Sequence, residues 1–389
     1  MSPNHDLRTE RGLSAYLASQ SISHTSATLL TGGTANYVYR VTYPSGQTTI
    51  YKHAAPYLHS NTSFAFDPSR MDYEDRILEL LPLLLKNKLL DSSVHAVGVK
   101  SYDCDKKLLG IEDGGKRHLK DAYTDPALDV PSVGASLGAW LATLHASTVL
   151  TPLSLDFNSQ DLEENNKVAV NVYRHSYKNL STAFADFTDL SNGDIELAQQ
   201  INDEYGSRLE HDNECICHGD FWPGNVMVKP HSVSSETKEE ERQGRVDLTV
   251  VDWEMTRRGT SATDLAQFCA ESFLLDRFCG NRGLLPAVLN AYLSHRLSLS
   301  SALPFPDKEW FRRLAIHWGV HVAFWPTRVE WTDRAGTQDL VAIGKEVLKA
   351  ATESKWDVLF GSTSEGYVDV PCVGLPVFRG LEERFTPEF

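Results

Sequence analysis

One short stretch, residues 217–228, constrains what this chain can fold into more than any other. It reads CHGDFWPGNVMV, so Asp220 precedes Asn225 by five positions. A second apolar run ends in Asp252, 27 positions after Asn225, and Glu254 follows two residues later. Because apolar runs of this length form strands that pair, the pattern predicts that these four side chains meet at one place.

The spacing of these four residues suits phosphotransfer chemistry. Phosphoryl transfer needs a group that orients the accepting hydroxyl and oxygen ligands for a divalent ion that neutralises the phosphates. We expect Asp220 to be the base, and Asn225 and Asp252 to bind Mg²⁺. Glu254 would point to the same side and bind a second metal, through water or directly. Asp, Pro, Gly and Asn also form ordinary turns, so the surrounding sequence has to decide between the two readings.

A glycine loop lies near the start of the chain. Strands are predicted over residues 27–30, 37–43 and 48–53, the first two separated by Gly32 and Gly33. A glycine pair alone favours a simple hairpin turn. Lys52 argues for more, because a lysine ending the third strand of a glycine-looped sheet holds ATP phosphates in kinases; a lone lysine would be a surface charge.

A long helix is predicted over residues 68–90, and Glu74 lies near its start. We expect Glu74 to pair with Lys52 and to aim it at the phosphates, with Glu79 as the second choice. The alternative is that Glu74 is an acidic residue favoured by a helix N-terminus. Two further strands, 94–102 and 107–112, precede a glycine hinge, where backbone groups near Ile111, Glu112 and Asp113 would meet adenine.

Beyond the hinge the pattern is mainly helical. Helices are predicted over residues 132–147, 168–185, 261–278, 284–297, 308–327 and 337–354. The polar run 232–245 is predicted to be a long exposed hairpin loop. Together, these predicted elements indicate an α+β, two-lobed fold like that of protein kinases. The nucleotide-binding lobe would cover residues 1–113, with an antiparallel sheet plus a helix. The larger, mainly helical catalytic lobe would cover residues 114–389.

Composition limits the partners. The formal net charge of −15 disfavours nucleic acid and anionic membranes, and the apolar run 77–90 is too interrupted to span a bilayer. The first residues lack the layout of a signal peptide, and the cysteines are sparse, so we expect a cytoplasmic protein. Cys215 and Cys217 would be metal ligands only with a second matching pair, and a strand makes them core residues instead.

These motifs together resemble the aminoglycoside phosphotransferase and choline kinase superfamily. The resemblance rests on His-Gly-Asp at 218–220, Asn225, Asp-Trp-Glu at 252–254, Gly259, Ser261 and Asp264, and earlier on residues 30–36, Lys52 and Glu74. Within that superfamily the layout is similar to methylthioribose kinases and fungal tryptamine kinases.

The resemblance implies a kinase-like fold that uses ATP and Mg²⁺, with Asp220 as catalytic base and Asn225 and Asp252 as metal ligands. It also implies that Gly32, Gly33 and Asn36 belong to the nucleotide loop, and that Asp264 supports the catalytic loop. The expected activity is transfer of the γ-phosphate of ATP to a hydroxyl of a small molecule, such as a hydroxylated amine, aromatic alcohol or sugar. The alternatives are a nucleotide-binding pseudokinase that serves as an interaction module, and a protein kinase.

Several residues stay open on sequence alone. Phe221 and Trp222 either form a wall for the acceptor or pack the loop. Arg257 and Arg258 either contact a ligand or are solvated, and His145 is more often structural than catalytic at a helix end. The aromatic and histidine residues of the helix near 317–325 either line a pocket or fill the core.

Overall fold

Five antiparallel strands form a sheet near the N-terminus, in the order β1-β2-β3-β8-β7. They are β1 (Ser26–Leu29), β2 (Tyr37–Thr42), β3 (Thr48–His53), β7 (Val99–Asp103) and β8 (Leu108–Glu112). The computed structural model describes residues 5–89, 92–156, 158–230, 246–299, 303–304, 306–360 and 378.

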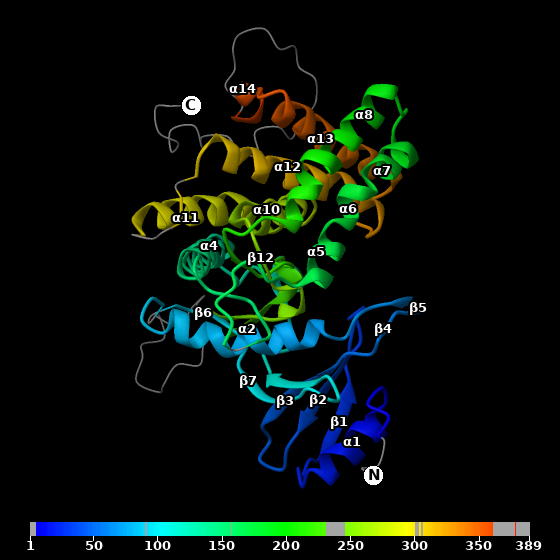
Figure 1. The fold of residues 1–389 in the computed structure, drawn as a ribbon, viewed down its shortest axis with the longest axis vertical. Helices are drawn as coiled ribbons and strands as arrows, with labels where there is room; N and C mark the ends of the chain where they lie inside the picture. Colours follow the sequence, from blue (N-terminus) through cyan, green and yellow to red (C-terminus); the bar gives the residue numbers. More distant parts are fainter. Residues whose placement is uncertain are drawn as a thin grey trace.

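Two helices cover the opposite faces of this sheet. Alternate residues of β2 and β3 pack on α1 (Glu10–Ser19), in a cluster that includes Leu13, Tyr39 and Tyr51. The other face packs on α2 (Arg70–Leu85), which buries Met71 and Ile77. Figure 1 shows α2 running between the sheet and the helical lobe. Residues on the α2 face of the sheet therefore lie near the boundary between the lobes.

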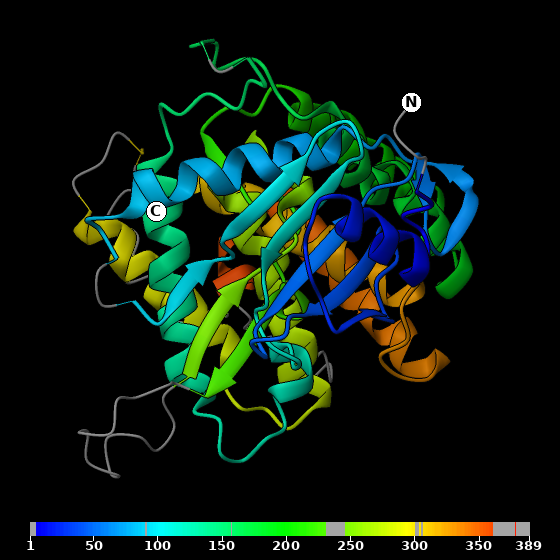
Figure 2. The same cartoon turned by 90° about the horizontal axis from the view of Figure 1, so that it is seen from below.

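A second, three-stranded sheet differs from the sequence prediction in one strand. The predicted strand 94–102 is interrupted at 97–98, so that β6 (Val94–Ala96) leaves the sheet and pairs in parallel with β11 (Val246–Val250). β11 also pairs with β10 (Val226–Pro230) in antiparallel fashion, as predicted for the arms of the long hairpin (Figure 2). The predicted hairpin loop itself, 232–245, lies outside the described residues.

A separate hairpin follows β3. It consists of β4 (Tyr57–Leu58) and β5 (Asn61–Ala65), which pair antiparallel to each other and form their own two-stranded sheet. The sequence prediction assigned no structure to these residues. Every residue of β5 is exposed, so the segment has no buried apolar face from which to recognise a strand.

Helices form most of the second lobe. They are α3 (Leu119–Ala122), α4 (Val130–Ser147), α5 (Lys167–Tyr173), α6 (His175–Lys178), α7 (Leu180–Phe187), α8 (Asn192–Ile201), α10 (Ser261–Phe278), α11 (Leu284–Ser298), α12 (Lys308–Phe324), α13 (Arg334–Thr352) and α14 (Trp356–Phe360). α4 lies directly against α11, because a Cβ at Gly138 would come within 2.3 Å of the Val288 carbonyl. Only glycine permits this close approach.

The helices predicted for 132–147, 261–278, 284–297, 308–327 and 337–354 are confirmed to within a few residues. The helical pattern predicted over 168–185 is confirmed, but it is divided into the three short helices α5, α6 and α7. The α+β, two-lobed fold is confirmed, while the division at residue 113 stays a prediction; β6 lies before that division yet pairs with β11 after it. In the part of the chain that the structure describes, we find no helix with the length and apolar character needed to cross a membrane.

Candidate active site

A short strand and a buried acid hold the loop that carries Asp220. β9 (Cys215–Cys217) leads into the loop, and Asp264 of α10 accepts hydrogen bonds from the backbone amides of His218 (2.8 Å) and Gly219 (2.9 Å). Gly219 has a φ of +82° and lies so close to Met255 that a Cβ would clash. Asp264 therefore supports the loop, as the resemblance implies.

His145 completes this support. Its Nε2 lies 3.2 Å from Asp264, and its Nδ1 lies 2.8 Å from the Tyr292 hydroxyl, with the ring fully buried. Burial opposes ionisation of Asp264, but the hydrogen bond and charge of His145 bring its pKa down to about 2. The structural reading of His145 is the one that the geometry supports.

Two amide side chains orient the carboxylate of Asp220. Gln267 of α10 donates to Oδ1 at 2.7 Å, and Asn225 donates to Oδ2 at 3.1 Å. Burial and the nearby carboxylate of Asp252 raise the pKa of Asp220 to about 7, although both amide hydrogen bonds oppose the rise. Asp220 is thus a fixed carboxylate with a raised proton affinity, which suits a group that accepts a proton from a hydroxyl.

The predicted pair of Lys52 and Glu74 is present. Lys52 Nζ lies 2.7 Å from Glu74 Oε2 and 2.6 Å from Asp252 Oδ1, and Glu79 is not needed. Burial opposes the charge of Lys52, but Asp252 and Glu74 hold its pKa above its ordinary value. Burial likewise opposes ionisation of Asp252, yet the ammonium of Lys52 keeps the pKa of that carboxyl low. Lys52 therefore joins α2 to the segment after β11.

Glu254 belongs to a buried network that sequence did not predict. Its Oε2 accepts hydrogen bonds from Arg70 Nε at 2.9 Å and Asn36 Nδ2 at 2.8 Å. Arg70 Nη2 in turn donates to Asn36 Oδ1 at 2.9 Å, which closes a ring of three side chains. The network ties the glycine loop, α2 and the Asp252-Trp253-Glu254 segment together.

The described residues contain two groups that have the ligand types of a metal site. In one, carboxylate oxygens of Glu74, Asp252 and Glu254 lie within 4.8 Å of one another. Such oxygens suit a hard ion like Mg²⁺, and the Asp252 side chain keeps 36% of its surface exposed. Asn225 lies beside them, because its backbone carbonyl accepts a hydrogen bond from the backbone amide of Val251, the residue before Asp252, at 2.9 Å. The donor set therefore fits a magnesium ion.

The second group consists of His145, Cys215 and Cys217, all buried. Both ring nitrogens of His145 already have partners in Tyr292 and Asp264. The two cysteines pack with Leu303 in a small apolar cluster. The prediction that the two cysteines of this strand are core residues is confirmed by their complete burial.

A cavity of about 870 Å³, here called the interlobe cavity, opens beside these groups. Its lining includes the predicted site residues Gly33, Asn36, Lys52, Asp220, Asp252 and Glu254. Further lining residues are Leu58, Phe64, Phe66, Val168, Val172, Tyr173, Gln267, His317, His321 and Trp325. Its size is that of a site for a small ligand.

One face of α12 supplies a wall of this cavity. His317 and His321, one helical turn apart, line the cavity together with Trp325, whereas Trp318 and Phe324 are buried in the core. Burial lowers the pKa of His317 well below its usual value, so the ring is neutral, and it stacks on Tyr173 with centroids 4.7 Å apart. Both interpretations left open for this helix are therefore correct, because one face lines a pocket and another fills the core.

Phe221 and Trp222 do not line the interlobe cavity. Phe221 is fully buried and stacks on Phe268 with ring centroids 4.7 Å apart. The indole of Trp222 covers Gly224 so closely that a Cβ there would lie 2.2 Å from it. Of the two readings left open, packing of the loop is the one the geometry supports.

The remaining predicted nucleotide residues lie around the glycine loop and the hinge. Gly32 has a φ of +103°, and the space around Gly32 and Gly33 is open. At the hinge, the side chain of Glu112 lies 3.4 Å from His95, and that of Asp113 bonds to Arg40 at 2.6 Å. These two carboxylates are engaged within the protein, so contact with a nucleotide would have to come from the backbone.

Neither Arg257 nor Arg258 is solvated, and each is about 1% exposed. Both lie on β12 (Arg257–Gly259). Arg258 donates to the carbonyls of Val149 and Thr151 and so fixes the chain after α4. Arg257 lies over the ring of Tyr173, 3.9 Å from its centroid. The solvated reading is wrong, and Arg257 reaches the cavity only through Tyr173.

Sequence reasoning missed Gln267 and Arg70, although a pattern could have found both. Gln267 lies three residues after Asp264 on a correctly predicted helix, and Arg70 lies four residues before Glu74 on another. Residues at these spacings share a helix face. A polar side chain on the same face as a functional acid was therefore a reasonable candidate.

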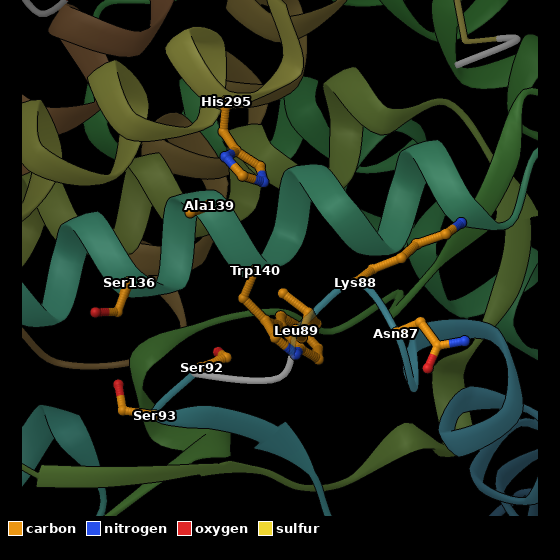
Figure 3. A pocket seen from close by; sticks show the side chains of 9 residues that line it. All are labelled: Asn87, Lys88, Leu89, Ser92, Ser93, Ser136, Ala139, Trp140 and His295. Atoms are coloured by element: carbon orange, nitrogen blue, oxygen red, sulfur yellow. The ribbon is translucent and has the colours of Figure 1, made fainter. Parts of the chain in front are cut away.

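A second cavity, of about 450 Å³, lies away from Asp220 between the end of α2, α4 and His295 of α11 (Figure 3). Trp140 lines it, and its indole Nε1 has no hydrogen-bond partner among the described residues. None of the predicted site residues lines this second cavity. It thus offers no route to the acids described above.

Comparisons with known proteins show which family and which proteins this chain is similar to. A model described as the phosphotransferase enzyme family matches residues 26–302, more than half of the chain. A 4-hydroxytryptamine kinase of Psilocybe cyanescens is 24% identical over 90% of this chain and 94% of its own length. A 4-hydroxytryptamine kinase of Psilocybe cubensis is 23% identical over 84% and 88%. Among solved structures, a Plasmodium vivax ethanolamine kinase gives a TM-score of 0.46 at 12% identity, over 88% and 89% of the two chains.

Proposed function

Because the chain belongs to the phosphotransferase enzyme family, we propose that it moves the γ-phosphate of ATP to a hydroxyl group of a small molecule. One observation carries the proposal. Asp220, oriented by two amides, faces the same cavity as Lys52 and Asp252, which are paired at 2.6 Å. A base and a phosphate-binding lysine on one cavity are what phosphoryl transfer needs.

The residues of the N-terminal sheet bind the nucleotide in this proposal. Lys52, held by Glu74, neutralises phosphate charge, and the open backbone of Gly32 and Gly33 lets a phosphate approach the loop. The hinge backbone near Glu112 and Asp113 receives the adenine. Asn36 acts indirectly, because its side chain is bonded to Glu254.

Asp252 and Asn225 would hold a magnesium ion, which neutralises the charge that develops on the phosphates. Glu254 would contribute through its other carboxylate oxygen, directly or through water, because its Oε2 is engaged by Arg70 and Asn36. Asp220 holds the acceptor hydroxyl in line and receives its proton at a carboxylate oxygen.

The acceptor enters the part of the interlobe cavity beyond Asp220. The lining there includes the aromatic side chains of Tyr173, Phe64 and Trp325, together with polar residues such as Lys167, Asn171 and His175. The relatives in Psilocybe are named as kinases of 4-hydroxytryptamine, a hydroxylated aromatic amine. Hydroxylated aromatic amines and aromatic alcohols are therefore proposed ahead of sugars.

The test is ATP consumption with magnesium against a panel of acceptors that contains 4-hydroxytryptamine, other hydroxylated amines, aromatic alcohols and sugars. We expect turnover with aromatic members, abolished in Asp220→Ala, with a phosphorylated product seen by mass spectrometry. Nucleotide binding without turnover across the panel would overturn the proposal and favour a pseudokinase that acts as an interaction module.

A further inference from the structure

The hairpin β4–β5 lies between β3 and α2 in the chain. Every residue of β5 is exposed, whereas both residues of β4 are half-buried. The hairpin carries Phe64, which exposes 51% of its surface. A single exposed apolar side chain is common on protein surfaces, so the exposure of Phe64 alone does not indicate binding. Its position suggests binding instead, because Phe64 lines the interlobe cavity.

The tip of the hairpin is bonded to the glycine loop. The amides of His59 and Ser60 donate to the carbonyls of Ala35 (3.2 Å) and Thr34 (3.0 Å), and the Ser60 hydroxyl donates to the same Thr34 carbonyl. The ring of His59 also lies 4.3 Å from that of Tyr37. Three hydrogen bonds and one ring contact therefore connect the hairpin tip to the loop and to the start of β2.

The base of the hairpin is fixed as well. Arg70 donates to the carbonyls of Phe66 (3.1 Å) and Asp67 (2.8 Å), and its guanidinium lies 4.0 Å from the centre of the Phe66 ring. Phe66 packs with Ala169 of α5 and with Met255. The hairpin thus reaches from the nucleotide loop across to the helical lobe.

The side chains of Leu58, Phe64 and Phe66 contribute an apolar surface to the interlobe cavity. The lining supplied by the helical lobe is also apolar or aromatic at Val168, Val172 and Tyr173. An acceptor that extends from Asp220 between these two surfaces would bury its apolar part against both lobes.

We propose that the hairpin 57–65 is a specificity element of the acceptor pocket that responds to the nucleotide. Phe64 binds an aromatic or apolar part of the acceptor, and a nucleotide under the glycine loop fixes the hairpin through Thr34 and Ala35. Nucleotide binding then raises acceptor affinity by reducing the entropy lost when the hairpin is ordered. The inference rests on the proposed function.

Hydrogen exchange with and without a non-hydrolysable ATP analogue and magnesium tests the coupling without any acceptor. We expect amides of 57–65 to exchange roughly tenfold more slowly together with those of 32–36. The double variant His59→Ala/Ser60→Ala removes the Ser60 hydroxyl bond and the ring contact with Tyr37 but keeps both backbone bonds, so it should weaken hairpin protection in part and leave loop protection. Thr62→Ala on the same hairpin should change neither. Protection of the loop alone in the unmodified protein would overturn the coupling; protection of neither would instead show that the nucleotide proposal fails.

Phe64→Ala tests the specificity. The KM for aromatic acceptors should rise roughly tenfold, because a partly buried phenylalanine contributes on this scale, while the KM for ATP stays unchanged. Leu83→Ala on α2, a residue 76% exposed and outside the cavity lining, is the matched control. An equal rise for aromatic and aliphatic hydroxylated amines, or no rise at all, would contradict a role of Phe64 in recognition.

Discussion

At the residue scale, the hydrogen bonds around Asp220 explain how a carboxylate on a loop keeps a fixed orientation. Gln267 and Asn225 each donate a hydrogen bond to one oxygen of the Asp220 carboxylate, so the carboxylate cannot rotate freely. The remaining lone pairs are left for the acceptor hydroxyl, since a carboxylate oxygen accepts more than one hydrogen bond. The amides therefore set the direction from which a proton arrives.

Replacing Asp220 by asparagine keeps the shape and removes the base. We expect Asp220→Asn to reduce turnover by about a hundred- to ten-thousand-fold, the range typical of a lost general base, with nucleotide affinity retained. Steady-state kinetics and calorimetric nucleotide binding measure the two effects. Asp189→Asn, at an exposed position, is the control, and near-normal turnover of Asp220→Asn would refute the assignment.

Gln267→Leu should act differently, because leucine fills similar space but cannot donate to Asp220. We expect kcat to fall by about tenfold, on the scale of one hydrogen bond to a charged group, with the KM for ATP and the melting temperature little changed. A fall in melting temperature that matches the loss of kcat would mean that Gln267 serves packing alone. The pair of measurements thus separates orientation of the base from stability.

Prediction from sequence succeeded for residues whose partners lie in strongly patterned elements. The ion pair between Lys52 and Glu74 was predicted because Lys52 lies near the end of a strand and Glu74 near the start of a helix. The contacts among Arg70, Asn36 and Glu254 could not be predicted, because these residues are separated by 34 to 218 positions in the sequence. Such contacts depend on how elements pack, which local periodicity does not contain.

At the scale of the element, α10 is the support of the loop. Its first turns carry Asp264, which holds two backbone amides, and Gln267, which holds the base. The helix was predicted with its observed bounds, 261–278. The division of the helical segment from residue 167 into α5, α6 and α7 was not predicted. Between α6 and α7, the side chain of Asn179 donates to the His175 carbonyl at 2.8 Å and competes with continued helix.

Asp264→Asn tests that support. The folded pKa of about 2 lies below the unfolded value of 3.8, so ionised Asp264 stabilises the fold above pH 4, and this contribution is lost as the pH falls towards 2. We expect the variant to lose roughly 2 kcal/mol of unfolding free energy at pH 7. Urea denaturation should show the difference from the unmodified protein shrinking below pH 4. A constant difference from pH 7 to 3 would argue against the ionised role.

At the scale of the whole molecule, ion pairs beside the interlobe cavity and a pair of hydrogen-bonded strands connect the two lobes. Lys52 of the sheet meets Asp252, and Arg70 of α2 meets Glu254. β6 also pairs with β11, and so connects residues on the two sides of the predicted division at 113. A ligand that binds Lys52 and Asp252 together would therefore hold the lobes in one relative position.

A magnesium–nucleotide complex should consequently stabilise the whole chain. At a hundred times its dissociation constant, a ligand that binds only the folded state adds about 2.7 kcal/mol, so the melting temperature should rise when a non-hydrolysable ATP analogue and magnesium are added together. Asp252→Ala should remove the magnesium-dependent part of this rise, because it deletes the proposed ligand while Lys52 keeps Glu74 as partner. Asp189→Ala should retain it. If Asp252→Ala is stabilised by magnesium and nucleotide as strongly as the unmodified protein, Asp252 is not a metal ligand, and the ion must be held by other oxygens.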